Sequence, residues 1–367
     1  MHQARPSWRR WPDWVAYATA AWSLGYSALG IWWARGGAGF PFGLANDSGA
    51  TLSWFTGATA RKGGPVIAAA GAIATLVALY MARQGHTERV GSNTTVATVV
   101  KAFGWTVAVI LCLGVPDFRV LVVVAYAPII LLGAPFDWPQ PVRLVDVIPW
   151  PVLNQAVCIV GGVAWAATTL AFQRRVGDAC AYCGRRSPRV EWQQPDAARR
   201  WGGWAVAVAV AIPLLYAATR FAWALGIPLG LTEAFYREGE RTGLWWRGAA
   251  LATLAVVGAA LTVGLAKPWG EVFPRWVPRL AGRRVPPALA IVPATFVSLI
   301  VSSAGLMFVR MAIRGTFMLG THRVTFTENW GGLWPELVWP IWGVALGAAT
   351  LAYQYRTRQR CRYCGRD

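Results

Sequence analysis

Four cysteines in two short motifs carry the clearest chemistry in this sequence. The motif Cys-x-x-Cys-Gly-Arg occurs at residues 180–185 and again at 361–366. Two cysteines separated by two residues can both reach one metal ion, and the following glycine lets the backbone turn so that its amides point at the thiolates. Two such motifs predict a shared tetrahedral zinc (Zn²⁺) site, and redox-active dithiols or reduced thiols without metal are the alternatives. The predicted ligands are Cys180, Cys183, Cys361 and Cys364.

The motifs end two copies of one longer unit. Val163–Gln173 is similar to Val344–Gln354, and each run leads into its cysteine motif at the same offset. Similarity at a fixed offset indicates an internal repeat. We therefore expect a first transmembrane repeat over residues 1–186, a cytoplasmic linker over 187–200 and a second transmembrane repeat over 201–367.

Composition indicates how these repeats fold. Hydrophobic residues make up 56% of the chain and charged residues only 14%, whereas a large soluble all-α protein would need charged helix faces. A bilayer-spanning helix needs about 20 apolar residues. We predict an all-α, polytopic membrane helical bundle of two parallel four-helix repeats. The eight expected spans are Trp14–Trp33, Gly64–Ala82, Val96–Val115, Val152–Phe172, Trp204–Leu225, Trp246–Ala266, Pro286–Ala312 and Leu337–Tyr353.

One further apolar run makes nine spans possible. Val120–Gly133 is short for a span and follows a turn-like segment at 116–119. The corresponding stretch of the second copy has no apolar counterpart, since it contains Arg314, His322 and Glu328. We expect a re-entrant or interfacial segment here, because that keeps both repeats in the same topology.

The basic residues predict the orientation. With eight spans, 22 Lys or Arg residues fall in the loops and tails on one side and 9 on the other. Lys and Arg concentrate on the cytoplasmic side, so both termini and both cysteine motifs should be cytoplasmic. The net charge of +19 then predicts attraction to anionic lipids of the bilayer at the cytoplasmic face. No specific nucleic-acid partner is expected, because the charge is spread over short loops next to the membrane.

Charged residues near the spans are further candidates. Arg119 and Arg310 occupy roughly equivalent places in the two copies, and they could bind an anion or a lipid head group or simply anchor helix ends. Lys101 and Arg220 lie within two turns of span ends, where their side chains are expected to extend to the interface.

Signatures of catalysis are missing from the sequence. Its three histidines, His2, His86 and His322, lie outside the predicted spans, which excludes haem held by two histidines within the bilayer. The sequence contains no phosphate-binding Gly-Lys loop and no Gly-x-Ser-x-Gly motif. We therefore predict that the protein is not an enzyme.

Several segments together resemble a known group of proteins. The two Cys-x-x-Cys-Gly-Arg ends, Val115–Arg119, Trp223–Gly230 and Leu280–Pro286 are similar to a family of multi-pass integral membrane proteins from actinobacterial genomes, whose halves each end in this motif. Arg outnumbers Lys by 32 to 3, which fits high-GC coding. The resemblance implies a bacterial plasma membrane location, and it carries over no catalytic residues because the family has no established activity.

Three functions follow from these observations. The first is solute or lipid binding or transport, with an unknown small molecule between the pseudo-symmetric halves. The second is a zinc-stapled membrane scaffold or sensor, in which a shared zinc ion staples the pseudo-symmetric halves and a basic face binds a cytoplasmic protein partner. The third, a membrane thiol oxidoreductase, fits less well because the cysteines are expected on the reducing side.

Overall fold

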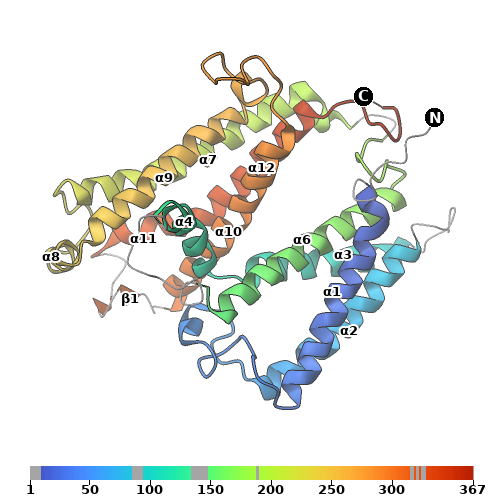
Figure 1. Ribbon diagram of the computed structural model, residues 1–367, viewed down its shortest axis with the longest axis horizontal. Coiled ribbons are helices and arrows are strands. Elements are labelled where there is room, and N and C mark those ends of the chain that lie inside the picture. Colours follow the sequence, from blue (N-terminus) through green and yellow to red (C-terminus); the bar gives the residue numbers. More distant parts are fainter. Residues whose placement is uncertain are drawn as a thin grey trace. The chain divides into compact units, whose positions relative to one another are not determined.

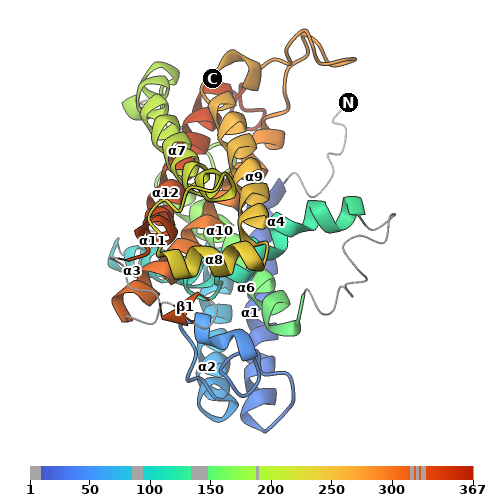
Figure 2. The same cartoon turned by 90° about the vertical axis from the view of Figure 1, so that its left-hand side faces the viewer.

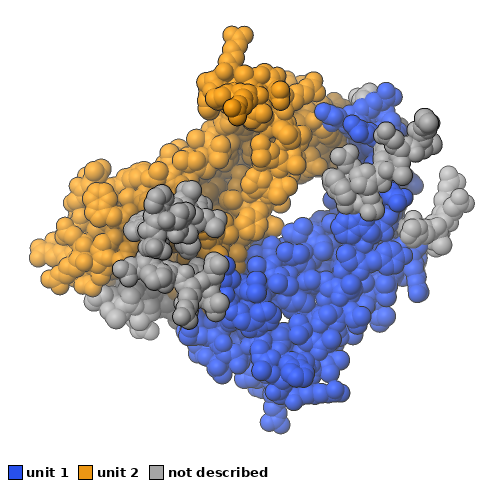
Figure 3. Space-filling view, viewed as in Figure 1, with its two compact units in different colours: residues 1–116, 142–190, 359–367 blue, residues 117–141, 191–358 orange. Residues whose placement is uncertain are grey.

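A computed structural model of the chain forms two compact units, which Figure 3 shows in different colours. Unit 1 contains residues 1–116, 142–190 and 359–367, and unit 2 contains 117–141 and 191–358. Residues 117–141 of the first predicted repeat thus belong to unit 2, and residues 359–367 of the second predicted repeat belong to unit 1. The structure describes residues 10–84, 94–133, 148–186, 190–314, 318–319, 322–323 and 328–366.

Helices dominate both units, as the apolar runs predict. Within the described residues, seven helices are long and apolar enough to cross a membrane, which indicates a multi-pass membrane protein. These candidate spans are Ala60–Arg83, Thr94–Gly114, Trp150–Val176, Pro195–Ala224, Leu244–Gly264, Pro287–Arg314 and Trp330–Thr357.

The first predicted span is a helix but is not among these seven. Helix α1 (Trp11–Ala34) is 24 residues long, and five of its residues are tryptophans. Its length suffices to cross a bilayer, but its mean hydropathy is lowered by tryptophan, tyrosine, serine and glycine residues. The eighth span therefore stays a prediction.

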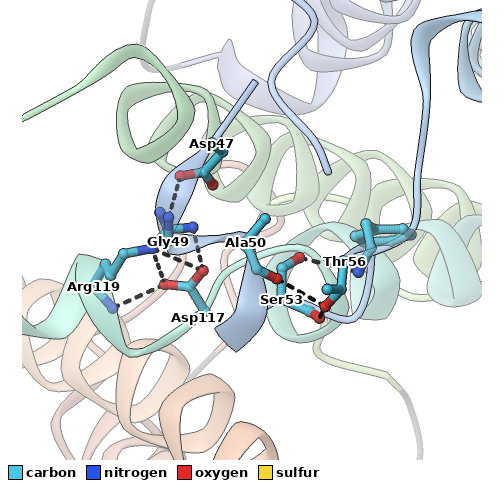
Figure 4. A network of polar contacts seen from close by, with 8 residues as sticks. Asp47, Gly49, Ala50, Ser53, Thr56, Asp117 and Arg119 are labelled. Atoms are coloured by element: carbon cyan, nitrogen blue, oxygen red, sulfur yellow. Dashed lines mark hydrogen bonds and ion pairs between the residues drawn. The ribbon is translucent and has the colours of Figure 1, made fainter. Parts of the chain in front are cut away.

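Unit 1 consists of four long helices. Besides α1 they are α2 (Ala60–Arg83), α3 (Thr94–Val109), which continues as a π-helical turn η3 (Ile110–Gly114), and α6 (Trp150–Val176). Helix α1 packs along α2, α3 packs along α6, and α6 also contacts α1 (Figure 1). A short helix, η2 (Ser48–Leu52), lies in the α1–α2 connection, where the Asp47 carboxylate accepts the Gly49 N–H at 3.0 Å (Figure 4).

Small residues let α1 and α2 approach closely. A Cβ atom at Gly71 would lie 2.7 Å from the backbone nitrogen of Ser27, and one at Gly64 would lie 2.6 Å from that of Ala34. Backbone atoms cannot move aside without separating the helices, so glycine is needed at these contacts.

We expect Gly71→Ala to destabilise unit 1 by about 1–3 kcal/mol, because the added methyl group forces the two helices apart. Gly25→Ala in α1 is the matched control, since a Cβ there meets no atom within 4 Å and alanine favours a helix. Thermal unfolding of the detergent-solubilised protein measures both. Equal unfolding midpoints for the two variants would contradict the proposed close packing.

The long helices of unit 2 contact one another in the same order as those of unit 1. Its long helices are α7 (Pro195–Ala224), α9 (Leu244–Gly264), α10 (Pro287–Arg314) and α12 (Trp339–Thr357). Helix α7 packs along α9, α10 packs along α12, and α12 also contacts α7. The shorter elements include η5 (Glu191–Gln193), α8 (Glu233–Arg241), η6 (Pro268–Gly270) and α11 (Trp330–Leu337). Figure 2 shows α8 and α11 in a second view.

Glycines at equivalent positions support the repeat. A side chain at Gly162 of α6 would collide with Cys112, and one at Gly343 of α12 would collide with Ser302. Each glycine therefore lets the last long helix of its unit touch the long helix before it. This correspondence favours duplication of one helical unit, and the parallel relation of two four-helix repeats stays a prediction.

The short apolar run also forms a helix. Helix α4 (Phe118–Gly133) belongs to unit 2 and packs against α10. The stretch thought to correspond to it in the second copy contains instead a pair of antiparallel two-residue strands, β1 (Met318–Leu319) and β2 (His322–Arg323). Whether α4 is re-entrant, interfacial or a ninth span stays a prediction.

Candidate metal centre

All four motif cysteines lie together in unit 1. Their Sγ atoms are within 4.8 Å of one another. Two of the pairs join the two motifs: Cys180 to Cys361 at 4.0 Å and Cys183 to Cys364 at 3.6 Å. These separations exceed a disulfide bond of about 2.05 Å. They agree with the spacing of about 3.8 Å that tetrahedral geometry gives to thiolates bound to zinc at about 2.3 Å.

Each motif folds into the same tight turn. The Gly184 N–H donates to the Cys180 carbonyl at 2.7 Å, and the Cys180 N–H donates to the Arg185 carbonyl at 3.0 Å. The same two bonds, each of 2.9 Å, form in the motif at 361–366. Gly184 and Gly365 have φ values of 73° and 68°, a left-handed conformation that a side chain disfavours. The glycine of each motif is therefore needed to close its turn.

The two turns contact each other through reciprocal bonds. Arg185 Nη1 donates to the Arg366 carbonyl at 3.0 Å, and Arg366 Nη1 donates to the Arg185 carbonyl at 3.0 Å. Tyr182 and Tyr363 stack in parallel, with ring centroids 3.5 Å apart and planes inclined by 4°. Because these contacts join equivalent residues, the two motifs form one module with approximate local two-fold symmetry.

Residues of α6 and α1 hold this module in place. Arg174, in the last turns of α6, donates through Nη1 to the carbonyls of Ala181 and Tyr182 at 3.1 Å. The Tyr182 hydroxyl donates to Asp13 of α1 at 2.9 Å, and Arg175 lies 3.4 Å from the same carboxylate. The first cysteine turn is thus fixed to the end of α6 and the beginning of α1.

Hydrogen bonds from the backbone make one thiol more acidic. Burial acts to raise the pKa of Cys361, but the backbone N–H groups of Cys364 and Tyr363 donate to its sulfur, and its pKa falls to about 7. Burial raises the pKa of the neighbouring Cys183 thiol. Arg174 and Arg185 use their guanidinium groups to bind loop carbonyls. Backbone amides therefore contribute to the stabilisation of the Cys361 thiolate.

The two arginines proposed to bind an anion lie in unit 2. Arg119 donates to both carboxylate oxygens of Asp117, with Nη2 at 2.6 Å, so an ion pair offsets its charge (Figure 4). Arg310 is buried in α10 and is 5% exposed. Binding of an anion or a head group by Arg119 and Arg310 stays a prediction.

A buried ion pair in unit 2 was not anticipated. Arg220, expected to extend to the interface, is only 7% exposed and is paired with Glu336 of α11. Its guanidinium also donates to the Gly331 carbonyl and lies 4.3 Å and 4.4 Å from the ring centroids of Tyr216 and Trp223. The predicted eighth span begins at Leu337, so Glu336, the partner of Arg220, falls just outside the predicted spans.

The apolar helices and the cysteine cluster together define the class of this protein. It is a helical membrane protein with a four-cysteine site that could hold a metal ion. No known protein family, no curated protein and no solved structure matches the chain. Its function is therefore inferred from the geometry of the site.

Proposed function

We propose that the four cysteines bind a single structural zinc ion and that the protein is a zinc-stapled scaffold of the bacterial plasma membrane. The observation that carries this proposal is the convergence of four Sγ atoms within 4.8 Å of one another. Four thiolates fill the tetrahedral coordination of zinc and leave no position for a substrate, which favours a structural role over a catalytic one.

The zinc ion would fasten a distant segment of chain to the loop after α6. Residues 359–367 belong to unit 1, and a shared ion would fix them against the turn at 180–185. The joined segments carry exposed arginines, which together present a basic face suited to an acidic cytoplasmic partner. These residues are Arg186, Arg360, Arg362 and Arg366.

The distribution of charge supports a cytoplasmic position for this face. The excess of basic residues on one side of the predicted spans favours a cytoplasmic position for both termini. The ion pair between Asp13 and Arg175 brings the beginning of α1 and the end of α6 to one end of unit 1, which fits an even number of crossings. A reducing compartment keeps thiols available for metal and disfavours a thiol oxidoreductase. Solute or lipid transport between the halves stays a prediction.

Metal analysis tests the proposal directly. Full-length protein purified in detergent should contain one zinc ion per chain by mass spectrometry, and a strong chelator should remove it. The four motif cysteines should resist alkylation until the metal is removed. Iron in place of zinc, no bound metal, or a disulfide within the cluster would overturn the assignment.

A phosphatase fusion tests the proposed orientation. A phosphatase fused to residue 367 should be inactive, and activity outside the membrane would overturn the orientation.

A further inference from the structure

Unit 2 contains an apolar cavity. Its volume is about 390 Å³, within the range of roughly 300–1,000 Å³ that small-molecule sites occupy. The end of α9, the beginning of α10, one face of α12 and the loop between α9 and α10 enclose it. All of these elements belong to unit 2, so the cavity is independent of the cysteine cluster.

The walls of the cavity suit a hydrocarbon ligand. Trp269, Phe273 and Trp342 supply aromatic surface, and most other lining residues are aliphatic. Among the described residues that line it, Thr262 alone carries a side-chain oxygen, and its hydroxyl already donates to the Gly258 carbonyl at 2.8 Å. A water molecule needs two to four polar partners, so this space favours an apolar occupant.

Hydrogen bonds fix the loop that covers the cavity. The Val285 N–H donates to the Glu271 carbonyl at 2.9 Å, and the Tyr353 hydroxyl of α12 donates to the Gly270 carbonyl at 2.7 Å. Arg356 of α12 pairs with the Glu271 carboxylate at 3.0 Å. The cavity is thus preformed, and the loop projects beyond the helix ends of unit 2 (Figures 1 and 2).

The same loop carries a strong positive charge. Glu271 is the one acidic residue among positions 267–286, and it is paired with Arg356. Trp276 is 81% exposed beside the cavity, where an indole ring fits the membrane–water interface. The exposed basic residues of the loop are Lys267, Arg275, Arg279, Arg283 and Arg284.

We propose that this cavity holds one acyl chain of an anionic phospholipid whose phosphate lies against the basic loop. The apolar walls select a hydrocarbon chain, while the unbalanced positive charge of the loop selects an anionic head group. An uncharged apolar solute would explain the cavity but would gain nothing from the five basic residues around it.

Lipid binding to the detergent-solubilised full-length protein tests this site. Native mass spectrometry would compare phosphatidylglycerol, which is anionic, with phosphatidylcholine, which is zwitterionic. We expect the wild type to bind phosphatidylglycerol more tightly. Gly258→Leu should abolish this binding, because a Cβ at Gly258 meets no atom within 4 Å and the leucine would extend into the cavity. Gly203→Leu on α7 is the matched control, since Gly203 is exposed and equally unobstructed.

A second pair of variants tests the head-group contact. Replacing both Arg275 and Arg279 with glutamine should weaken phosphatidylglycerol binding by roughly thirtyfold and phosphatidylcholine binding much less, because the choline group offsets the charge of its phosphate. Arg241→Gln on α8 is the control for loss of an exposed charge and should have no effect. Unchanged lipid binding in Gly258→Leu, or equal binding of the two lipids by the wild type, would overturn the proposal. All variants should keep their zinc, which distinguishes failure here from failure of the metal site.

Discussion

Replacing Cys361 with serine should release the metal from all four cysteines, including the pair on the other motif. The sulfur of Cys361 lies 4.0 Å from that of Cys180, so both motifs would act on one ion. Two cysteines left at 180 and 183 form only half of a tetrahedral site, and zinc affinity falls steeply when ligands are lost. Zinc content should drop from one ion per chain to almost none.

A buried cysteine outside the cluster provides the control. Cys158 lies in α6, where its sulfur is 3.5 Å from the Tyr26 hydroxyl, a contact that serine can keep. Cys158→Ser should therefore retain a full zinc content. Mass spectrometry of both variants and of Cys180→Ser measures the effect. If Cys361→Ser still bound zinc through the first motif, each motif would be a separate site and the shared centre would be wrong.

Replacing Arg220 with methionine should cause the largest loss of folding stability. The carboxylate of Glu336 would remain buried in unit 2 without its cationic partner. Breaking a buried ion pair by removing one partner costs about 3–5 kcal/mol, because the remaining charge is desolvated and uncompensated. The unfolding midpoint in detergent should fall by roughly 10 °C.

An exposed ion pair and a double variant test whether the unpaired buried charge causes the stability loss in Arg220→Met. Arg237 and Glu233 form an ion pair on α8, with side chains 69% and 63% exposed, so Arg237→Met should cost less than about 0.5 kcal/mol. Replacing both Arg220 and Glu336 with methionine should recover much of the lost stability, since no unpaired charge remains. Equal midpoints for Arg220→Met and Arg237→Met would show that the buried pair contributes little.

The cysteine residues of the cluster could be predicted because each Cys-x-x-Cys motif is recognised by its spacing within six residues. Spacing within 180–185 and 361–366 identifies the candidate ligands, and the repeat together with the even number of predicted spans between the motifs predicts that they lie on one side of the membrane. Contacts such as the stacking of Tyr182 on Tyr363 needed the structure. Two tyrosines at matching positions were visible, but their approach depends on how the turns face each other.

Features that depend on contacts between distant helices could not be predicted. Apolar periodicity identifies the long helices, but it cannot show that Arg220 reaches Glu336, because the pairing depends on how α7 packs beside α11. The cavity escaped notice for a similar reason. The sequence of residues 267–284 reveals its positive charge, whereas Trp269 and Phe273 form walls of the cavity only once the loop folds back on α9 and α10.

The separation of the two cysteine pairs along the chain determines when the metal site can form during synthesis. Cys361 follows Cys180 by 181 residues, which at ordinary rates of translation is a delay of roughly 10–40 s. Throughout that interval the first pair offers only two sulfur ligands while the helices of unit 2 are being made. If the cluster binds zinc as proposed, zinc capture would be a late step in biogenesis, and it would mark chains in which residues 359–367 have reached their place in unit 1.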